Sequence, residues 1–384
     1  MTLLKTPLYD WHKNKANMVP FAGFEMPVVY KSPSSISIEH NVIRNHAGLF
    51  DVSHMGRMLV SGKNALEFIN LLVPRDLKTL QLHKVAYTYF LNELAGFRDD
   101  ITVAKMGEFE YLITWNAGNL WKIWHWTNDL ASIYRSQNNA DVQIKNITGQ
   151  TAMIAFQGPK APELTEKMFG LFPGSWKVSN TKYKGIEVSI FGSGYTGESG
   201  CEIIIYNTSL TNPEHAITIW EDLLSLEGVM ACGLGARDTL RTEAGMPLYG
   251  NDINENINPI EAGLAFPPLI NFDKDYFIGK EALLKLKAEE NNLLKRVGLI
   301  AIKKGPAPRP GMKLYHLGKE IGFVSSGSFS PLLKIGIGMG FIPNSFAMGE
   351  ELIAKDTTSD KEINVKISPF PLYNSEEFGS KRKK

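Results

Sequence analysis

Two adjacent carboxylates, Asp99 and Asp100, could do acid–base or electrostatic chemistry. They follow the turn-like segment NELAGFR and precede an apolar run with the pattern of a β-strand. Because successive side chains of a strand point to opposite faces, we expect at most one of the two carboxylates to face a given pocket. The spacing alone leaves two interpretations open, which are turn chemistry at a solvated edge and a carboxylate directed at a substrate amine.

Two further charged positions could hold a polar ligand. Glu202 lies at the start of the isoleucine-rich segment CEIIIY, and a carboxylate beside an apolar run suits recognition of an aminopyrimidine edge. Arg237 lies near the start of an expected helix after GLGA, with Arg241 one turn later. An arginine there could form ion pairs along the helix, or it could bind a substrate carboxylate through two hydrogen bonds.

Several other chemistries find little support. The eight histidines show no HxH or HExxH spacing, so we expect no metal site. His54 has no nucleophile elbow near it, and we expect a packing or hydrogen-bonding role for it. Gly192, Gly194 and Gly197 spell GxGxxG, but a strand-like segment follows where a dinucleotide site requires a helix. We therefore predict a hairpin turn at these glycines.

Length and charge set the broad class of the protein. A chain of 384 residues exceeds one ordinary core, so two or three domains are expected. The net charge of +1 gives no general attraction to nucleic acid or membranes. Cys201 and Cys232 form no disulfide framework, which fits a reducing compartment. We find no signal or transit peptide and no stretch of ~18 apolar residues, and we expect the basic end 381–384 to be solvated.

The hydrophobic patterns predict an α+β fold of mostly antiparallel sheets rather than a doubly wound one. The predicted helices include 36–48, 64–72, 119–134 and a linker helix over 285–295, and the predicted strands include 50–62, 85–93 and a pair within 101–116. Gly245 and Pro247 give a stop signal for the helix that contains Arg237. The cluster of Trp121, Trp124 and Trp126 is expected to pack in a core. Beyond residue 295, short strands and turns predict an all-β domain.

Nine sequence blocks in order carry a resemblance to one family. They include TPLYDWH (6–12), RNHAGLFDVSHMG (44–56), LNELAGFRDDI (91–101), GYTGESGCEI (194–203) and the long block CGLGARDTLRTEAGMPLYGNDINENINPIEAGL (232–264). The chain resembles the glycine cleavage system T protein, a tetrahydrofolate-dependent aminomethyltransferase. The resemblance implies a three-domain cloverleaf around a central folate-binding hole, with a C-terminal jelly-roll-like barrel. The implied domains are 1–55 with 148–251, 56–147 with 252–287, and 288–384.

The resemblance also implies an activity and a site. The enzyme would receive an aminomethyl group from the lipoyl arm of the H protein, release ammonia and form methylene-tetrahydrofolate, without a metal, nucleic acid or membrane. Asp100 matches the carboxylate near nitrogen 10 of the folate, where an anion would stabilise a developing iminium-like charge. Folate-binding positions are matched by Tyr87, Asn116, Tyr195, Glu202, Arg237 and, more loosely, Tyr373. A cytoplasmic location is implied, or a mitochondrial one if a presequence has been removed.

The chain departs from the family pattern at Phe24, Ala104, Trp115 and Gly192. Trp115 and Ala104 suggest a paired exchange of side-chain size within the pocket. Two alternatives to aminomethyl transfer stay open: another folate-dependent one-carbon transferase or demethylase on the same scaffold, and a folate-binding protein without transfer chemistry. The retained DD pair and the GARD segment favour aminomethyl transfer.

Overall fold

The computed structural model of the chain describes residues 2–359 and 361–382. Lys383 and Lys384 of the basic end therefore lie outside the described residues. The fold is α+β with mostly antiparallel sheets and a closed C-terminal barrel, which confirms the predicted class. Two compact units are formed, one from 1–90, 99–194 and 198–237, the other from 91–98, 195–197 and 238–384. Within the described ranges, no helix is long and apolar enough to cross a membrane.

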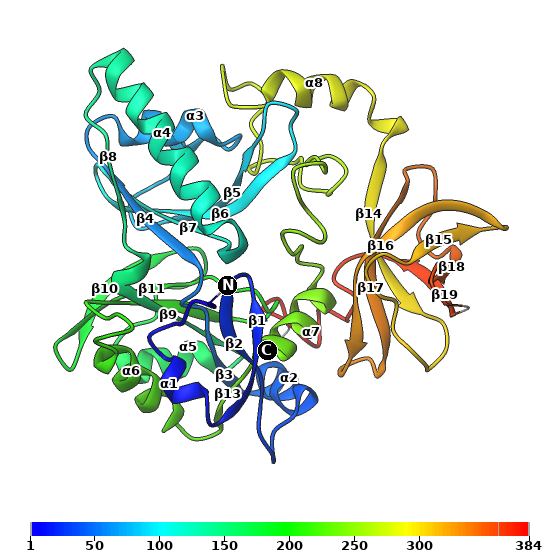
Figure 1. The fold of residues 1–384 in the computed structure, drawn as a ribbon, viewed down its shortest axis with the longest axis horizontal. Helices are drawn as coiled ribbons and strands as arrows, with labels where there is room; N and C mark the ends of the chain where they lie inside the picture. The colour runs from blue at the N-terminus through cyan, green and yellow to red at the C-terminus, as the bar shows by residue number, and fades with distance from the viewer. Residues whose placement is uncertain (1, 360, 383–384) are drawn as a thin grey trace. The chain divides into compact units, whose positions relative to one another are not determined.

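A six-stranded sheet forms one core of the first unit (Figure 1). Its strands, in spatial order, are β10 (Val178–Tyr183), β11 (Ile186–Phe191), β12 (Gly200–Tyr206), β9 (Thr151–Gln157), β3 (Ala47–Asp51) and β13 (Val229–Ala231). Only β13 runs parallel to its neighbour β3, and the other pairs are antiparallel. The helices α5 (Ala161–Phe169) and α6 (Glu214–Leu224) pack against this sheet. Alternate residues such as Ile203 and Ile205 are fully buried beside Trp220 of α6, as expected for an apolar face covered by helices.

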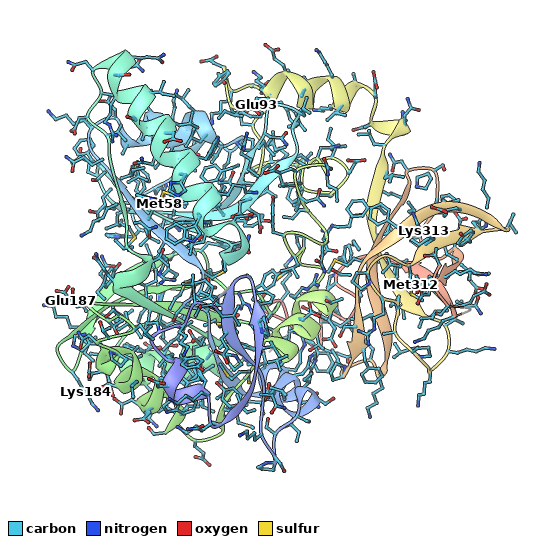
Figure 2. The ribbon with its side chains drawn as sticks, in the orientation of Figure 1. Met58, Glu93, Lys184, Glu187, Met312 and Lys313 are labelled. Carbon is cyan, nitrogen blue, oxygen red and sulfur yellow. The ribbon has the colours of Figure 1, made fainter. Side chains whose placement is uncertain are left out.

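The residues of the turn explain the hairpin of β10 and β11 at the edge of this sheet. Lys184 and Gly185 join β10 to β11, and both have positive φ angles, which a two-residue hairpin turn requires. Lys182 and Glu187 face each other across the two strands and form an exposed ion pair of 3.2 Å. Lys184 and Glu187 lie at the periphery of the sheet (Figure 2). Exposed pairs of this kind contribute little stability, so the buried face holds the sheet together.

The second sheet of this unit is five-stranded (Figure 1). Its order is β5 (Val85–Leu91), β6 (Phe97–Gly107), β7 (Glu110–Trp115), β4 (Gly56–Ser61) and β8 (Gln143–Asn146). The helices α3 (Ala65–Leu72) and α4 (Leu120–Asn138) contact β7 and β8 of this sheet, respectively. Met58 of β4, which is labelled in Figure 2, is fully buried. The single strand predicted over 50–62 is wrong. Residues 52–55 form a turn, so that β3 and β4 join two different sheets.

The aromatic cluster on α4 corrects another expectation. Trp121 is 58% exposed and stacks on His125, with ring centroids 6.2 Å apart, so it does not pack in a core. The helix buries a stripe at Leu120, Ile123, Thr127 and Ala131, whose spacing of three and four residues gives one face. Trp121 lies off that stripe, whereas Trp126 packs edge-on against Phe90 at 5.0 Å.

The remaining elements of the first unit are short. They are α1 (Tyr9–His12), the antiparallel pair β1 (Ala16–Phe21) and β2 (Phe24–Tyr30), α2 (Ile36–Asn45), η1 (Leu77–Thr79), η2 (Ala117–Asn119) and η3 (Thr148–Gln150). The side chain of Ser35 caps α2 by accepting a hydrogen bond from the backbone N–H of Ile38. The helix ends three residues before the predicted end at residue 48, because β3 begins at Ala47.

The second unit contains the predicted all-β domain. A closed barrel is formed in the order β14 (Leu294–Ala301), β17 (Ile335–Pro343), β16 (Lys319–Ser330), β15 (Lys313–His316), β18 (Glu351–Lys355) and β19 (Glu362–Ser368). Met312 belongs to the barrel core, and Lys313 lies next to it (both are labelled in Figure 2). Lys313 forms an ion pair of 3.0 Å with Glu320. A closed barrel leaves no unpaired strand edge.

Two helices and a buried ion pair complete this description. Helix α7 (Leu234–Ala244) begins earlier than predicted. It ends at Ala244, and the φ of 77° at the following Gly245 confirms the glycine stop. The predicted linker helix is displaced: α8 spans Lys280–Ala288, η4 spans Glu290–Asn292, and β14 already begins at residue 294. Within the second unit, Asp252 accepts hydrogen bonds from Arg241 (2.6 Å) and from two serines of the SSGSFSP segment.

Candidate active site

The aspartate pair lies inside strand β6, which begins at Phe97, and not in a turn. Burial alternates along this strand: Asp99, Ile101 and Val103 are buried, whereas Asp100 is only partly buried. The alternation confirms that the two carboxylates leave the strand on opposite faces. Asp99 is fully buried and hydrogen-bonded, so the interpretation of this residue as part of a solvated turn is wrong.

One carboxamide reaches both carboxylates, which the sequence reasoning did not anticipate. Asn116 follows the last residue of β7, and its Nδ2 donates to Oδ1 of Asp99 at 2.8 Å and to Oδ1 of Asp100 at 2.7 Å. The backbone N–H of Asn116 also donates to Oδ2 of Asp99 at 3.1 Å. Because Asn116 stands at the end of its strand, its side chain reaches both faces of the neighbouring β6. The two carboxylates are therefore parts of one hydrogen-bonded group.

Tyr87 completes the surroundings of Asp100. Its hydroxyl donates to Oδ2 of Asp100 at 3.1 Å, so each oxygen of this carboxylate accepts a hydrogen bond. Burial raises the pKa of Asp100 to about 6, although the bonds from Tyr87 and Asn116 oppose that rise. Burial and the charge of Asp100 also raise the pKa of Asp99. Asp100 is thus a partly accessible carboxylate that changes protonation near neutral pH, a property typical of functional sites.

Glu202 has a separate partner. It lies on β12, partly buried, and Oγ of Ser193 donates to its Oε2 at 2.7 Å. The amide of Gln157 donates to the backbone carbonyls of Ser193 and Cys201 and so ties the turn to the strand. β12 runs antiparallel to β11 after the GxGxxG segment, which confirms a hairpin connection and excludes the strand–turn–helix context of a dinucleotide site. Ser193 was not singled out from the sequence.

Arg237 lies on α7, partly buried, with its guanidinium carbon 6.0 Å from the ring centre of Phe50. Arg241 forms an ion pair along the helix with Asp238, and it also pairs with Asp252, which lies beyond the end of the helix. His54 is buried, and its ring lies 5.7 Å from that of Phe21 and 6.1 Å from that of Phe24, measured between centroids. Burial, together with the smaller effect of the positive charge of Arg237, lowers the pKa of His54 to about 4, so the imidazole is neutral at pH 7. A packing role for His54 agrees with its aromatic contacts.

Tyr195 and Tyr373 belong to the second unit. The hydroxyl of Tyr195 donates to the backbone carbonyl of Pro247. Tyr373 is buried, and its hydroxyl lies against Gly197, where a side chain at position 197 would approach it to 2.5 Å. Gly197, with a φ of 77°, therefore permits the close approach of this tyrosine to the GYTGE turn.

The proposed size exchange between Trp115 and Ala104 is wrong. Trp115 pairs with Ile101 and Ala104 pairs with Leu112, so Trp115 and Ala104 lie on opposite faces of the sheet. The space for the indole is provided by Gly56, which pairs with Trp115 from the other side. A Cβ atom at position 56 would lie 2.0 Å from Cε2 of Trp115.

Comparisons with known proteins agree with this fold. The family description "GCVT N-terminal domain" matches residues 8–274, and "Glycine cleavage T-protein C-terminal barrel domain" matches residues 295–374. An aminomethyltransferase from Caldanaerobacter subterraneus subsp. tengcongensis is 42% identical over 90% of this chain and 89% of its own length. A probable aminomethyltransferase from Pyrococcus furiosus is 38% identical over 97% of both chains. The crystal structure of glycine cleavage system aminomethyltransferase T from Bartonella henselae superimposes with a TM-score of 0.86 at 31% identity, covering 97% of this chain and 98% of that one.

These matches place the chain in the class of enzymes that combine a T-protein N-terminal region with a C-terminal barrel. The chain belongs to the glycine cleavage T-protein family, and it is an aminomethyltransferase. The resemblance inferred from the nine sequence blocks is thereby confirmed.

Proposed function

We propose that this aminomethyltransferase uses tetrahydrofolate as co-substrate and takes its aminomethyl group from the lipoyl arm of a glycine cleavage H protein. Family membership over both parts of the chain supports this reaction. The observation that carries the proposal is the carboxylate of Asp100, which is partly accessible and hydrogen-bonded at both oxygens by Tyr87 and Asn116. A carboxylate fixed in this way suits a reaction in which positive charge develops on the substrate.

The reaction exchanges the bonds of one carbon. The methylene carbon gives up its bonds to the lipoyl sulfur and to the amino nitrogen, and it forms bonds to two folate nitrogens. Ammonia leaves, and the lipoyl arm regains its thiol. An iminium-like cation forms along this path, and the negative charge of Asp100 would lower its energy more than that of the neutral ground state. Asp100 could also accept a proton from a folate nitrogen, since its pKa of about 6 is close to neutral pH.

The remaining predicted residues are proposed to bind folate. Glu202 would accept hydrogen bonds from the aminopyrimidine edge, and Ser193 would fix the orientation of its carboxylate. Arg237 would meet an oxygen or carboxylate of the co-substrate through its guanidinium. Asn116 would act through its Oδ1, since both hydrogens of its Nδ2 are directed at the aspartates. Tyr87, Tyr195 and Tyr373 are proposed as further contacts. No metal, nucleic acid or membrane is invoked.

The proposed domains are 1–55 with 148–251, 56–147 with 252–287, and 288–384. The strands of each large sheet and those of the barrel fall within one of these divisions, which supports the proposal. Limited proteolysis tests it: the first cuts are expected near residue 288, between α8 and β14. A first cut inside one of the three proposed divisions would contradict the boundaries. A cytoplasmic location is proposed, and fractionation of the source cells would test it.

A reconstituted assay tests the proposed reaction. The purified chain, chelator-treated, is mixed with aminomethyl-loaded H protein and tetrahydrofolate, and ammonia and methylene-tetrahydrofolate are measured together. Equal amounts of the two products, formed only when both substrates are present, are expected. If folate binds but no product forms from the loaded H protein, the chain uses another one-carbon donor. If folate does not bind, the folate-dependent reaction is contradicted.

A further inference from the structure

Asp99, the buried member of the aspartate pair, accepts hydrogen bonds that a residue with only a packing role would not need. Asp99 accepts hydrogen bonds from the backbone N–H of Asn116 on Oδ2, from Nδ2 of Asn116 on Oδ1 and from the backbone N–H of Asp100 on Oδ1. The side chain of Asn119 adds another. The backbone and the side chain of Asn116 are thus both attached to the same carboxylate. Two attachments of this kind fix the orientation of the Asn116 side chain.

These hydrogen bonds determine which group of the Asn116 amide, the NH2 or the Oδ1, is free to contact a substrate. Because the carboxylates of Asp99 and Asp100 can only accept hydrogen bonds when ionised, the NH2 group must face them. The Oδ1 atom of Asn116 has no partner among residues 2–359 and 361–382. Without Asp99, the amide could rotate by half a turn, and its NH2 group would leave Asp100.

We propose that Asp99 is a positioning residue: from the buried side of β6 it fixes Asn116, which in turn holds the carboxylate of Asp100 and presents an amide oxygen to the substrate. This inference rests on the proposed function, because it concerns the same site. Asp99 itself does not contact the substrate. Loss of either Asp99 or Asp100 is therefore expected to slow the reaction.

The ability of both Asp99 oxygens to accept hydrogen bonds is as important as the shape of the side chain. An asparagine at position 99 would direct an NH2 group at N–H donors, whichever way its amide turned, because both carboxylate oxygens of Asp99 face donors. Asp99→Asn should therefore release Asn116, although the side chains have nearly the same shape. A displacement of about 1 Å in such a group can cost about 10²-fold in rate.

A double-mutant cycle distinguishes positioning from a general loss of stability. We expect Asp99→Asn and Asn116→Ala each to lower kcat about 10²-fold, and the double variant to lower it by about the same factor, because both changes remove one linked contact. Independent contributions would instead multiply to about 10⁴-fold. That multiplicative result, or a loss of less than about threefold in Asp99→Asn, overturns the proposal.

Two further variants keep the test decisive. Glu39→Gln is a matched control, because Glu39 is another buried carboxylate that accepts hydrogen bonds from backbone N–H groups, those of Tyr30 and Gly233. It is expected to lower the unfolding midpoint while changing kcat by less than about threefold. If Asp99→Asn does not fold, Asn119→Ala replaces it, with an expected loss of several-fold that vanishes in the Asn116→Ala background. An undiminished loss in that background contradicts the proposal. Wild-type turnover in the same assay tests the proposed function separately.

Discussion

The hydroxyl of Tyr87 donates a hydrogen bond to Oδ2 of Asp100 at 3.1 Å, across neighbouring strands of the five-stranded sheet. This bond stabilises the ionised carboxylate more than the protonated one, and so it opposes the effect of burial on the pKa of Asp100. Tyr87 therefore helps to set the pH range in which Asp100 is charged.

The first prediction concerns the pH dependence of the Tyr87→Phe variant. Since the ionised form of Asp100 is the active one in our proposal, wild-type kcat should rise with pH through about 6. Removing the hydroxyl removes a contact that lowers the pKa of Asp100, so the acid limb should move upward by about one unit. The measurement is kcat from pH 5 to 9. An acid limb that stays in place, or moves down, contradicts this role of Tyr87.

The second prediction separates binding from catalysis at Glu202. Glu202→Ala should weaken tetrahydrofolate binding by about ten- to a hundredfold, because hydrogen bonds to a charged group contribute about 1.5–3 kcal/mol. Asp100→Ala should weaken binding much less. Isothermal titration calorimetry measures both affinities.

Ser193→Ala is the graded control for this comparison. It keeps the carboxylate of Glu202 but removes the hydrogen bond of 2.7 Å that orients it, so a smaller loss of affinity is expected. Unchanged affinity in Glu202→Ala, or the same loss in all three variants, would speak against recognition of the folate by Glu202.

The third prediction concerns packing beneath the site. Gly56→Ala should destabilise the fold by about 2 kcal/mol or more, because the added Cβ would lie 2.0 Å from the buried indole of Trp115. Gly149→Ala is the matched control, since no atom lies within 4 Å of a Cβ at that position. Urea unfolding midpoints are compared. Adding Trp115→Phe should restore part of the loss in Gly56→Ala, and equal midpoints for the two glycine variants would refute the steric account.

Local patterns predicted the class of the fold and the strand that carries the site. Apolar alternation identified β6 and β7, and it gave the correct faces for Asp99 and Asp100, because the side-chain period of a strand is a local property. Turn residues and short apolar runs predicted the strands of the C-terminal barrel in the same way. The resemblance then supplied the family, which comparisons with whole chains confirmed.

The errors arose where distant segments meet. Residues 50–62 read as one strand, and only the pairing of β3 with β9 and of β4 with β7 and β8 reveals two. Trp115 and Ala104 suggested an exchange of side-chain size, but the strand register places them on opposite faces. The space for the Trp115 indole is provided by Gly56, 59 positions earlier in the sequence. Register depends on pairing partners, which a single sequence does not reveal.

The contact between Asn116 and both carboxylates was missed for a related reason. Alternation assigns one face to each residue inside a strand, but it does not apply to Asn116, which follows the last residue of β7. A signal was present in the sequence: Asn116 and Asn119 are short polar residues at the junction between a strand and a helix. Such residues frequently hydrogen-bond to nearby polar groups.

The most direct test of the central claim is the single-turnover rate of methylene-tetrahydrofolate formation by Asp100→Asn, measured with aminomethyl-loaded H protein and saturating folate. Asparagine retains the shape of the side chain and removes its charge, so the rate should fall about 10²–10³-fold. The affinity for tetrahydrofolate should stay within about threefold of the wild-type value, because the charge acts on the transition state. A rate close to that of the wild type, or a loss of rate explained entirely by lost folate binding, would contradict the role of Asp100.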